Sequence, residues 1–170
     1  MSLDGFIAGP DDDLSFLSLV EDENEDYGNN EFIKTVDTVI MGRKTYDKIN
    51  SMVNEFPHKD KEVIIISATQ KKENGKISFY NGDLTELASD LKRKKGGNIF
   101  IDGGADVVNG LLMNNMIDEY YISVIPVLLG EGVRLFKEGR PESELILVSS
   151  KSFRKGLVQL DYRSTKINLS

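Results

Sequence analysis

Three short apolar runs, each ending at a small or polar residue, are the clearest pattern along the chain. They cover residues 38–41, 63–66 and 99–101. None of them alternates between apolar and polar positions, and this is typical of strands that are buried on both faces. Such strands occur in parallel sheets that helices cover from both sides. We therefore expect an α/β fold with a mostly parallel central sheet.

Amphipathic helices are predicted between these strands. The clearest has an apolar stripe at i, i+3, i+4 and i+7, formed by Leu84, Leu87, Ala88 and Leu91. Asp83 or Thr85 could cap this helix, and Gly96-Gly97 would end it. Weaker helical patterns cover residues 31–36, 44–53 and 106–114.

The last third of the chain has a different pattern. Residues 120–129 form a long apolar run that contains Pro126, which predicts a strand with a break or bulge. Residues 145–153 and 157–165 alternate in part around Lys155-Gly156, which predicts a C-terminal antiparallel hairpin. No linker divides the sequence, so we expect a single domain over residues 1–170.

The composition excludes several kinds of site. The 170 residues include no cysteine and one histidine, His58. Disulfide scaffolds, thiolate zinc sites, iron–sulfur clusters and cysteine nucleophiles are ruled out, and we expect no metal site. A Ser-His-Asp hydrolase is disfavoured by the same count. His58 follows Pro57 in a polar segment, and we expect its side chain to be solvated.

The net charge of −7 argues against non-specific binding to nucleic acid or to acidic lipid, but it leaves room for a small anionic ligand. No run approaches the roughly 20 apolar residues that a membrane span needs. The first residues lack the basic region and the apolar stretch of a signal peptide, so we expect a cytoplasmic location. The acidic run over residues 21–26 is expected to be a solvated loop.

Phosphate-binding chemistry is indicated at the ends of two of the predicted strands. In open α/β sheets, ligands bind beyond the carboxyl ends of the strands. Gly103 and Gly104 stand between a strand and a helix, where the backbone can approach a pyrophosphate and the helix N-terminus offers N–H groups. Arg43 and Lys44 stand in the first turn of another helix, where the helix dipole disfavours cations unless an anion binds. The Thr45 hydroxyl could share that phosphate. A tight turn and a pair of solvated basic residues are the alternative interpretations.

Two further segments are weaker candidates. Ser67 and Thr69 supply hydroxyl groups at a third strand end, with Lys71-Lys72 just beyond, and they could hold an extra ribose phosphate or form an ordinary loop. The N-terminal segment at residues 3–9 has glycines four positions apart, which indicates either a loop that can close over a ligand or a frayed end.

Taken in order, four segments resemble the reductase domain of RibD, the bifunctional riboflavin-biosynthesis deaminase/reductase, and in particular its stand-alone bacterial members. Residues 2–10 (SLDGFIAGP) look like the opening signature of that domain. Residues 39–46 (VIMGRKTY) are similar to the cofactor segment that the family shares with dihydrofolate reductase. Residues 101–106 (IDGGAD) look like the family's glycine pair, and residues 126–136 (PVLLGEGVRLF) resemble the late signature. The resemblance covers nearly the whole chain.

The resemblance implies a dihydrofolate-reductase-like three-layer fold, an NADPH cofactor and a homodimer. It implies hydride transfer to a C=N or C=O bond of a small heterocyclic or ribosylaminopyrimidine-like substrate, as in 5-amino-6-(5-phosphoribosylamino)uracil reductase. The implied cofactor-binding residues are Gly42, Arg43, Lys44, Thr45, Ser67, Ala68, Thr69, Gly103, Gly104, Ala105, Asp106 and Val107. Asp4 and Gly5 would lie over nicotinamide and substrate, and Asp102 would contact the substrate, relay a proton or cap the following helix.

Two departures from the family pattern limit what the resemblance implies. An apolar strand usually precedes the SLDG segment, and we expect that N-terminal strand to be missing from this sequence. Asp102 stands where RibD-type domains often carry Glu. Dihydrofolate reductase holds its pterin with an acid on its first helix, for which Asp26 and Glu31 are the nearest candidates. The uncertain place of that acid counts against folate reduction. A dihydrofolate or pterin reductase and a non-catalytic nucleotide-binding dimer are the alternative functions.

Overall fold

The computed structural model describes residues 1–69 and 75–165 of the chain. It forms two compact units: residues 28–111 make up one, and residues 1–27 with the chain from residue 112 onward make up the other. We call them the inserted unit and the terminal unit. Within the described ranges, no helix has the length and apolar character needed to cross a membrane.

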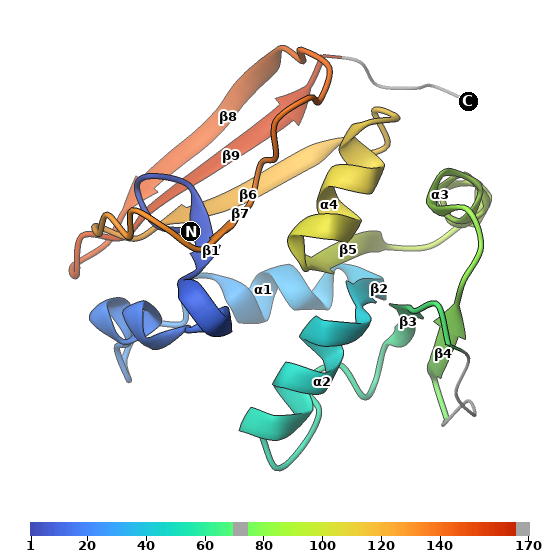
Figure 1. Cartoon of the computed structure of the whole chain (residues 1–170), viewed down its shortest axis with the longest axis horizontal. Helices are drawn as coiled ribbons and strands as arrows, with labels where there is room; N and C mark the ends of the chain where they lie inside the picture. Colours follow the sequence, from blue (N-terminus) through green and yellow to red (C-terminus); the bar gives the residue numbers. More distant parts are fainter. Residues whose placement is uncertain (70–74, 166–170) are drawn as a thin grey trace. The chain divides into compact units, whose positions relative to one another are not determined.

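The inserted unit alternates helices and strands. Its elements are α1 (Asn29–Lys34), β2 (Val36–Gly42), α2 (Arg43–Met52), β3 (Glu62–Ile66), β4 (Ile77–Tyr80), α3 (Leu84–Arg93), β5 (Asn98–Gly103) and α4 (Ala105–Leu112). Its four strands are parallel, in the order β4-β3-β2-β5 (Figure 1). The expectation of a parallel central sheet is confirmed.

The strand order determines on which face each helix lies. Crossovers between parallel strands are right-handed. Helix α2 joins β2 to β3 in one direction across the sheet, whereas α3 joins β4 to β5 in the opposite direction. The two helices therefore cover opposite faces, which gives the unit the three layers that the resemblance implied.

The apolar runs recognised in the sequence form the core of this unit. Alternate residues of the two central strands pack on one face with α1 and α2, in a cluster that includes Val39, Met41, Val63, Ile65, Phe32, Tyr46 and Ile49. The residues between them, Ile40 and Ile64, are buried too and point to the other face. Burial on both faces explains why β2 and β3 show no alternation.

The terminal unit is antiparallel. Its elements are β1 (Phe6–Ala8), the 3₁₀ helices η1 (Pro10–Asp12) and η2 (Ser15–Val20), β6 (Glu119–Val124), β7 (Val133–Arg134), β8 (Leu145–Ser152) and β9 (Val158–Ser164). Strand β1 pairs with β7, and the predicted C-terminal hairpin is the β8–β9 pair, to which β6 adds on the β9 side (Figure 1).

Among the described residues, no strand precedes β1. The first two residues instead pair with the end of β6: Ser2 forms an isolated parallel bridge with Ile125, and the amino group of Met1 donates to the Ser123 carbonyl at 2.6 Å. Strand β6 ends at Val124, shortly before Pro126, where the sequence predicted a break.

Helix α3 shows which of the two proposed caps acts. The Asp83 carboxylate accepts hydrogen bonds from the backbone N–H of Thr85 and Glu86, at 2.7 and 2.9 Å. The helix ends at Arg93, before the glycine pair that was expected to end it.

The structure differs from the sequence predictions at two strands. Strand β4 was not predicted, because its residues are all only half-buried. The prediction that residues 99–101 are buried on both faces was wrong, since β5 is an edge strand and these residues are half-buried. The acidic run 21–26 lies in turns outside regular elements, as expected.

Candidate functional site

The carboxyl ends of β2, β3 and β5 meet at one edge of the parallel sheet. Gly42 pairs with Ile66 of β3, and its neighbour Met41 pairs with Gly103 of β5. The three strand ends singled out in the sequence are therefore brought together within the inserted unit.

Glycines stand where the end of β2 and the start of α2 meet the turn before α4. A Cβ built on Gly42 would lie 3.6 Å from the Gly104 nitrogen and 3.5 Å from the Val107 side chain. A Cβ built on Gly104 would lie 3.2 Å from the Thr45 hydroxyl, which is tighter than ordinary contact. Gly103 has φ of +99°, a conformation that favours glycine. The turn is a cradle of backbone atoms with one hydroxyl group at its side, and it is tight at Gly104.

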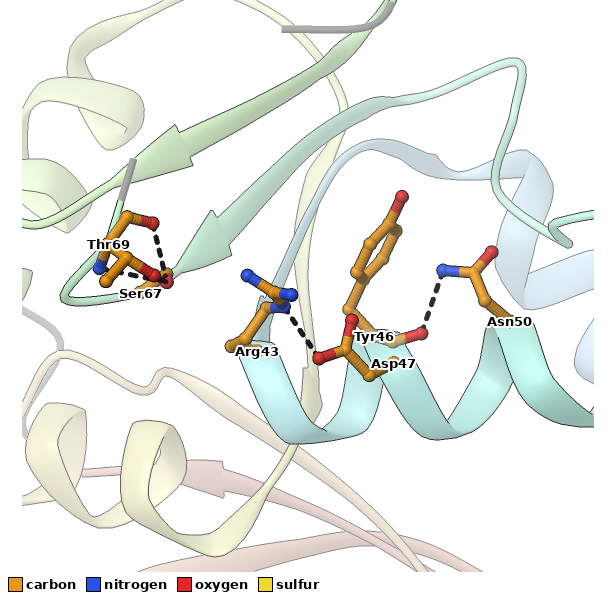
Figure 2. A network of polar contacts seen from close by, with 6 residues as sticks. All are labelled: Arg43, Tyr46, Asp47, Asn50, Ser67 and Thr69. Atoms are coloured by element: carbon orange, nitrogen blue, oxygen red, sulfur yellow. Dashed lines mark hydrogen bonds and ion pairs between the residues drawn. The ribbon is translucent and has the colours of Figure 1, made fainter. Parts of the chain in front are cut away.

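Helix α2 begins at this cradle with a basic residue. The N-cap residue is Gly42, which has no side chain, so no side chain caps the N–H groups of the first turn. The Arg43 guanidinium lies 5.9 Å from the centre of the Phe79 ring, and its Nε donates to Asp47 at 2.7 Å (Figure 2). Lys44 is exposed. The first turn thus carries two cations, one of them held in place.

The segment after β3 folds back on itself. The Ser67 hydroxyl donates to the Thr69 carbonyl at 2.9 Å and accepts from the Thr69 N–H at 3.3 Å (Figure 2). Ser67 is buried, whereas Ala68 and Thr69 are exposed. Residues 70–74, which include the Lys71-Lys72 pair, lie outside the described residues.

Asp102 occupies an irregular position in β5. Ile40 pairs with Ile101, but the next residue, Met41, pairs with Gly103, so Asp102 is the extra residue of a bulge. Bulges re-aim side chains and occur often beside functional sites. The Asp102 carboxylate lies 3.1 Å from Nε2 of His58.

The expectation that His58 is solvated was wrong. His58 is only 7% exposed, because its ring packs against the edges of Phe56 and Phe100 and contacts Asp102. The sequence signal was present in the flanking Phe56, but the polar residues after His58 obscured it.

Asp4 belongs to the terminal unit and already has partners there. Its carboxylate accepts from the Ser2 hydroxyl at 2.6 Å and from the N–H groups of Gly130 and Leu129, at 2.7 and 3.1 Å. The Ser2 hydrogen bond, with those two amides and against partial desolvation, lowers the pKa of Asp4 to about 2. Gly5 has φ of +91°, and its carbonyl accepts from Leu135. This carboxylate anchors the late signature segment and is ionised at neutral pH.

The two acids considered for pterin binding, Asp26 and Glu31, are both at the surface. Asp26 is exposed in the terminal unit. Glu31 pairs with Lys34 at 2.5 Å on α1, with four-fifths of its side chain exposed. In the described ranges, no three His, Asp or Glu side chains gather as metal ligands.

A hollow of about 550 Å³ lies at the opposite edge of the parallel sheet, near the amino ends of β2, β3 and β4. It is lined by Val36, Asp37, Asp60, Lys61, Glu62, Gly75, Lys76, Ile77 and Ser78. None of the predicted site residues lines it. The chemistry that suits an anion is at the glycine edge, so we place the candidate site there.

The chain was compared with known families, sequences and structures. Residues 1–159 match the RibD C-terminal domain family. The uncharacterized protein YwjB of Bacillus subtilis (strain 168) is 39% identical over 163 residues, which cover 95% of this chain and 92% of that protein.

Two solved structures have a fold similar to that of this chain. A protein of Shewanella sp. PV-4, provisionally assigned to riboflavin biosynthesis, has a TM-score of 0.88 at 31% identity, covering 98% of this chain and 96% of that one. Dihydrofolate reductase from Enterococcus faecalis, solved with NADP(H), has a TM-score of 0.61 at 15% identity over 82% of each chain. The second likeness concerns the fold alone, and it confirms the expected dihydrofolate-reductase-like architecture.

Proposed function

Because the chain belongs to the RibD C-terminal domain family, we propose that it is an NADPH-dependent reductase of a small heterocyclic or ribosylaminopyrimidine-like substrate. The observation that carries this proposal is the glycine cradle at the shared edge of β2 and β5, beside the basic first turn of α2. NADPH needs both features, since its pyrophosphate requires close backbone approach and its 2′-phosphate requires cations.

The residues present fit such a cofactor. The backbone of Gly42, Gly103 and Gly104 leaves no side chain in the cradle, and the Thr45 hydroxyl borders it. Val107 and Val108 donate to the Gly104 carbonyl, which starts α4 directly at the turn. In this proposal the N-terminal segments of α2 and α4, including Ala105 and Asp106, hold the pyrophosphate.

The basic residues account for the choice of NADPH over NADH. The guanidinium of Arg43 and the ammonium of Lys44 would bind the adenosine 2′-phosphate. Exposed Ala68 and Thr69, after the buried Ser67, would line the adenosine side.

The reaction also needs a proton. When bound, NADPH supplies a hydride to a C=N or C=O bond. Asp102 stands at the strand end next to the cradle with a quarter of its side chain exposed, and its Oδ2 is occupied by His58. Its Oδ1 is the atom that we assign to substrate contact or proton exchange. A role of Asp4 and Gly5 in substrate binding stays a prediction from the family resemblance, and the Asp4 carboxylate is already bonded within its own unit.

The names of relatives support this substrate class. The Shewanella protein carries an assignment to riboflavin biosynthesis, and the enterococcal dihydrofolate reductase was solved with NADP(H). The first is consistent with a substrate from riboflavin biosynthesis, and the second supports the fold alone.

Thermal unfolding with NADPH, with NADH and without ligand tests cofactor binding, because a ligand that binds only the folded state stabilises it by about 2.7 kcal/mol at 100 times its Kd. NADPH oxidation is then followed with 5-amino-6-(5-phosphoribosylamino)uracil and with dihydrofolate. Oxidation with the first substrate supports the proposal, and oxidation with dihydrofolate alone favours the pterin reductase. Stabilisation by NADPH without oxidation favours the non-catalytic binding protein, whereas absence of stabilisation contradicts the proposal.

We also propose that the protein forms a homodimer through β8. This strand is an edge of its sheet, and all eight of its residues are exposed. Four consecutive apolar residues on it, Leu145, Ile146, Leu147 and Val148, are 39 to 57% exposed. An exposed apolar edge strand is a pairing surface, and a second copy supplies the same strand around a two-fold axis.

A further inference from the structure

The only histidine of the chain is held in an apolar pocket on one face of the parallel sheet. It comes from the loop between α2 and β3, and nine-tenths of its side chain is buried. Phe56 and Phe100 meet the imidazole ring edge-on, with ring centres 5.7 and 6.2 Å away. A polar ring in such surroundings needs a hydrogen-bond partner.

Asp102 is that partner, and the β5 bulge brings it there. Without the extra residue, the register that pairs Ile40 with Ile101 would pair Met41 with Asp102. The bulge instead leaves Asp102 outside the pairing, with its Oδ2 3.1 Å from Nε2 of His58. The next residue is Gly103, where the cradle begins.

The second ring nitrogen fixes the position of the proton. Nδ1 of His58 is buried, and no hydrogen-bond partner for it is present in the described structure. A proton on Nδ1 would be a buried donor without an acceptor, which is unfavourable. The favoured tautomer of the neutral ring therefore carries its proton on Nε2, which donates to the Asp102 carboxyl group.

We propose that His58 is a positioning residue for Asp102: its Nε2–H holds the carboxylate in one orientation at the end of β5, with Oδ1 left for the substrate. This inference rests on the proposed function for its catalytic meaning, but the hydrogen bond can be tested without turnover. Without that donor, the carboxylate would no longer be held in one orientation, and Oδ1 would lose its fixed place beside the cradle.

The first experiment uses the fact that the chain has one histidine, so ¹⁵N NMR of the imidazole gives a single unambiguous set of signals. The expected result is a protonated Nε2 and an unprotonated Nδ1, with the Nε2 proton protected from exchange with water. In Asp102→Ala that protection should be lost, whereas Asp106→Ala, which removes an exposed acid four residues on, should leave the signals unchanged. A proton on Nδ1, or signals that do not respond to Asp102→Ala, would overturn the inference.

The second experiment separates positioning from packing. His58→Phe keeps an aromatic ring in the pocket without the donor, and His58→Gln keeps an N–H donor. With the substrate that the reductase test identifies, His58→Phe should lower kcat at least tenfold and leave the KM for NADPH within about twofold. His58→Gln should recover at least a third of the wild-type kcat. Equal kcat in His58→Phe and wild type, with both folded, contradicts a positioning role.

The two tests distinguish this inference from the function on which it rests. If the wild type fails to oxidise NADPH with every substrate tested, the reductase proposal fails. The NMR result still decides whether the hydrogen bond exists. If turnover is found and the imidazole signals contradict the Nε2–H arrangement, the inference fails and the reductase stands.

Discussion

Arg43 offers the most direct test of the cofactor site. It is the first residue of α2, three-quarters of its side chain is buried, and its Nε is held by Asp47 at 2.7 Å. In the proposed complex its remaining N–H groups bind the 2′-phosphate of NADPH, which NADH lacks. Replacing Arg43 by Ala should therefore affect the two nucleotides differently.

The magnitude follows from the kind of bond that is lost. A hydrogen bond to a charged group contributes about 1.5–3 kcal/mol, and each 1.4 kcal/mol is tenfold in affinity. Arg43→Ala should raise the Kd for NADPH roughly 10- to 150-fold and change the Kd for NADH less than about threefold. The cost to folding should be small, because an i,i+4 helix pair whose acid is half exposed contributes only about 0.3–0.5 kcal/mol.

Titration calorimetry at one fixed ionic strength provides the assay, since salt screens the phosphate contact. Two variants of the same helix serve as controls. Lys48→Ala removes an exposed cation from α2 and should change neither Kd. Asp47→Ala removes the carboxylate that competes for the guanidinium and should leave NADPH binding equal or tighter. Equal losses for NADPH and NADH in Arg43→Ala, or no loss for either, would refute a 2′-phosphate role.

Three further predictions concern the cradle, the N-terminal anchor and the exposed strand. Gly104→Ala should raise the Kd for NADPH at least about tenfold in a fluorescence titration, because its Cβ would lie 3.2 Å from a hydroxyl oxygen; an unchanged Kd would contradict the cradle. The pKa of Asp4 is lowered from 3.8 to about 2 in the folded protein, so the unfolded protein binds a proton at this carboxyl more readily. The contribution of Asp4 to folding stability is therefore lost as the pH falls from about 4 to 2. In urea unfolding, the stability difference between wild type and Asp4→Asn should shrink over that range, whereas the exposed control Asp11→Asn should run parallel to wild type; a constant difference for Asp4→Asn would argue against the anchor. Light scattering should show a dimer for the wild type and a monomer for Leu147→Glu, and a wild-type monomer at tens of micromolar would contradict the β8 interface.

The local patterns of the chain were sufficient for most of the fold. Residues 63–66 became β3 with one residue added, and the apolar stripe that starts at Leu84 became α3, because burial on both faces of a strand and on one face of a helix leaves a periodic trace in the sequence. Strand β4 leaves a weaker trace, since half-burial does not separate its residues into apolar and polar sets.

The candidate site divides in the same way. The sequence predicts which strands are followed by glycines and cations, because a turn or the start of a helix depends only on neighbouring residues. The contact between Gly42 and Gly104 depends on the order of the strands. The contact between Asp102 and His58 depends on the bulge that takes Asp102 out of the strand pairing. His58 and Asp102 are 44 residues apart in the chain, and nothing local to either records the other. Contacts between distant segments are determined by the packing of the whole sheet. The sequence alone therefore indicated which kinds of residue form the site, and only the tertiary structure showed which of them lie in contact.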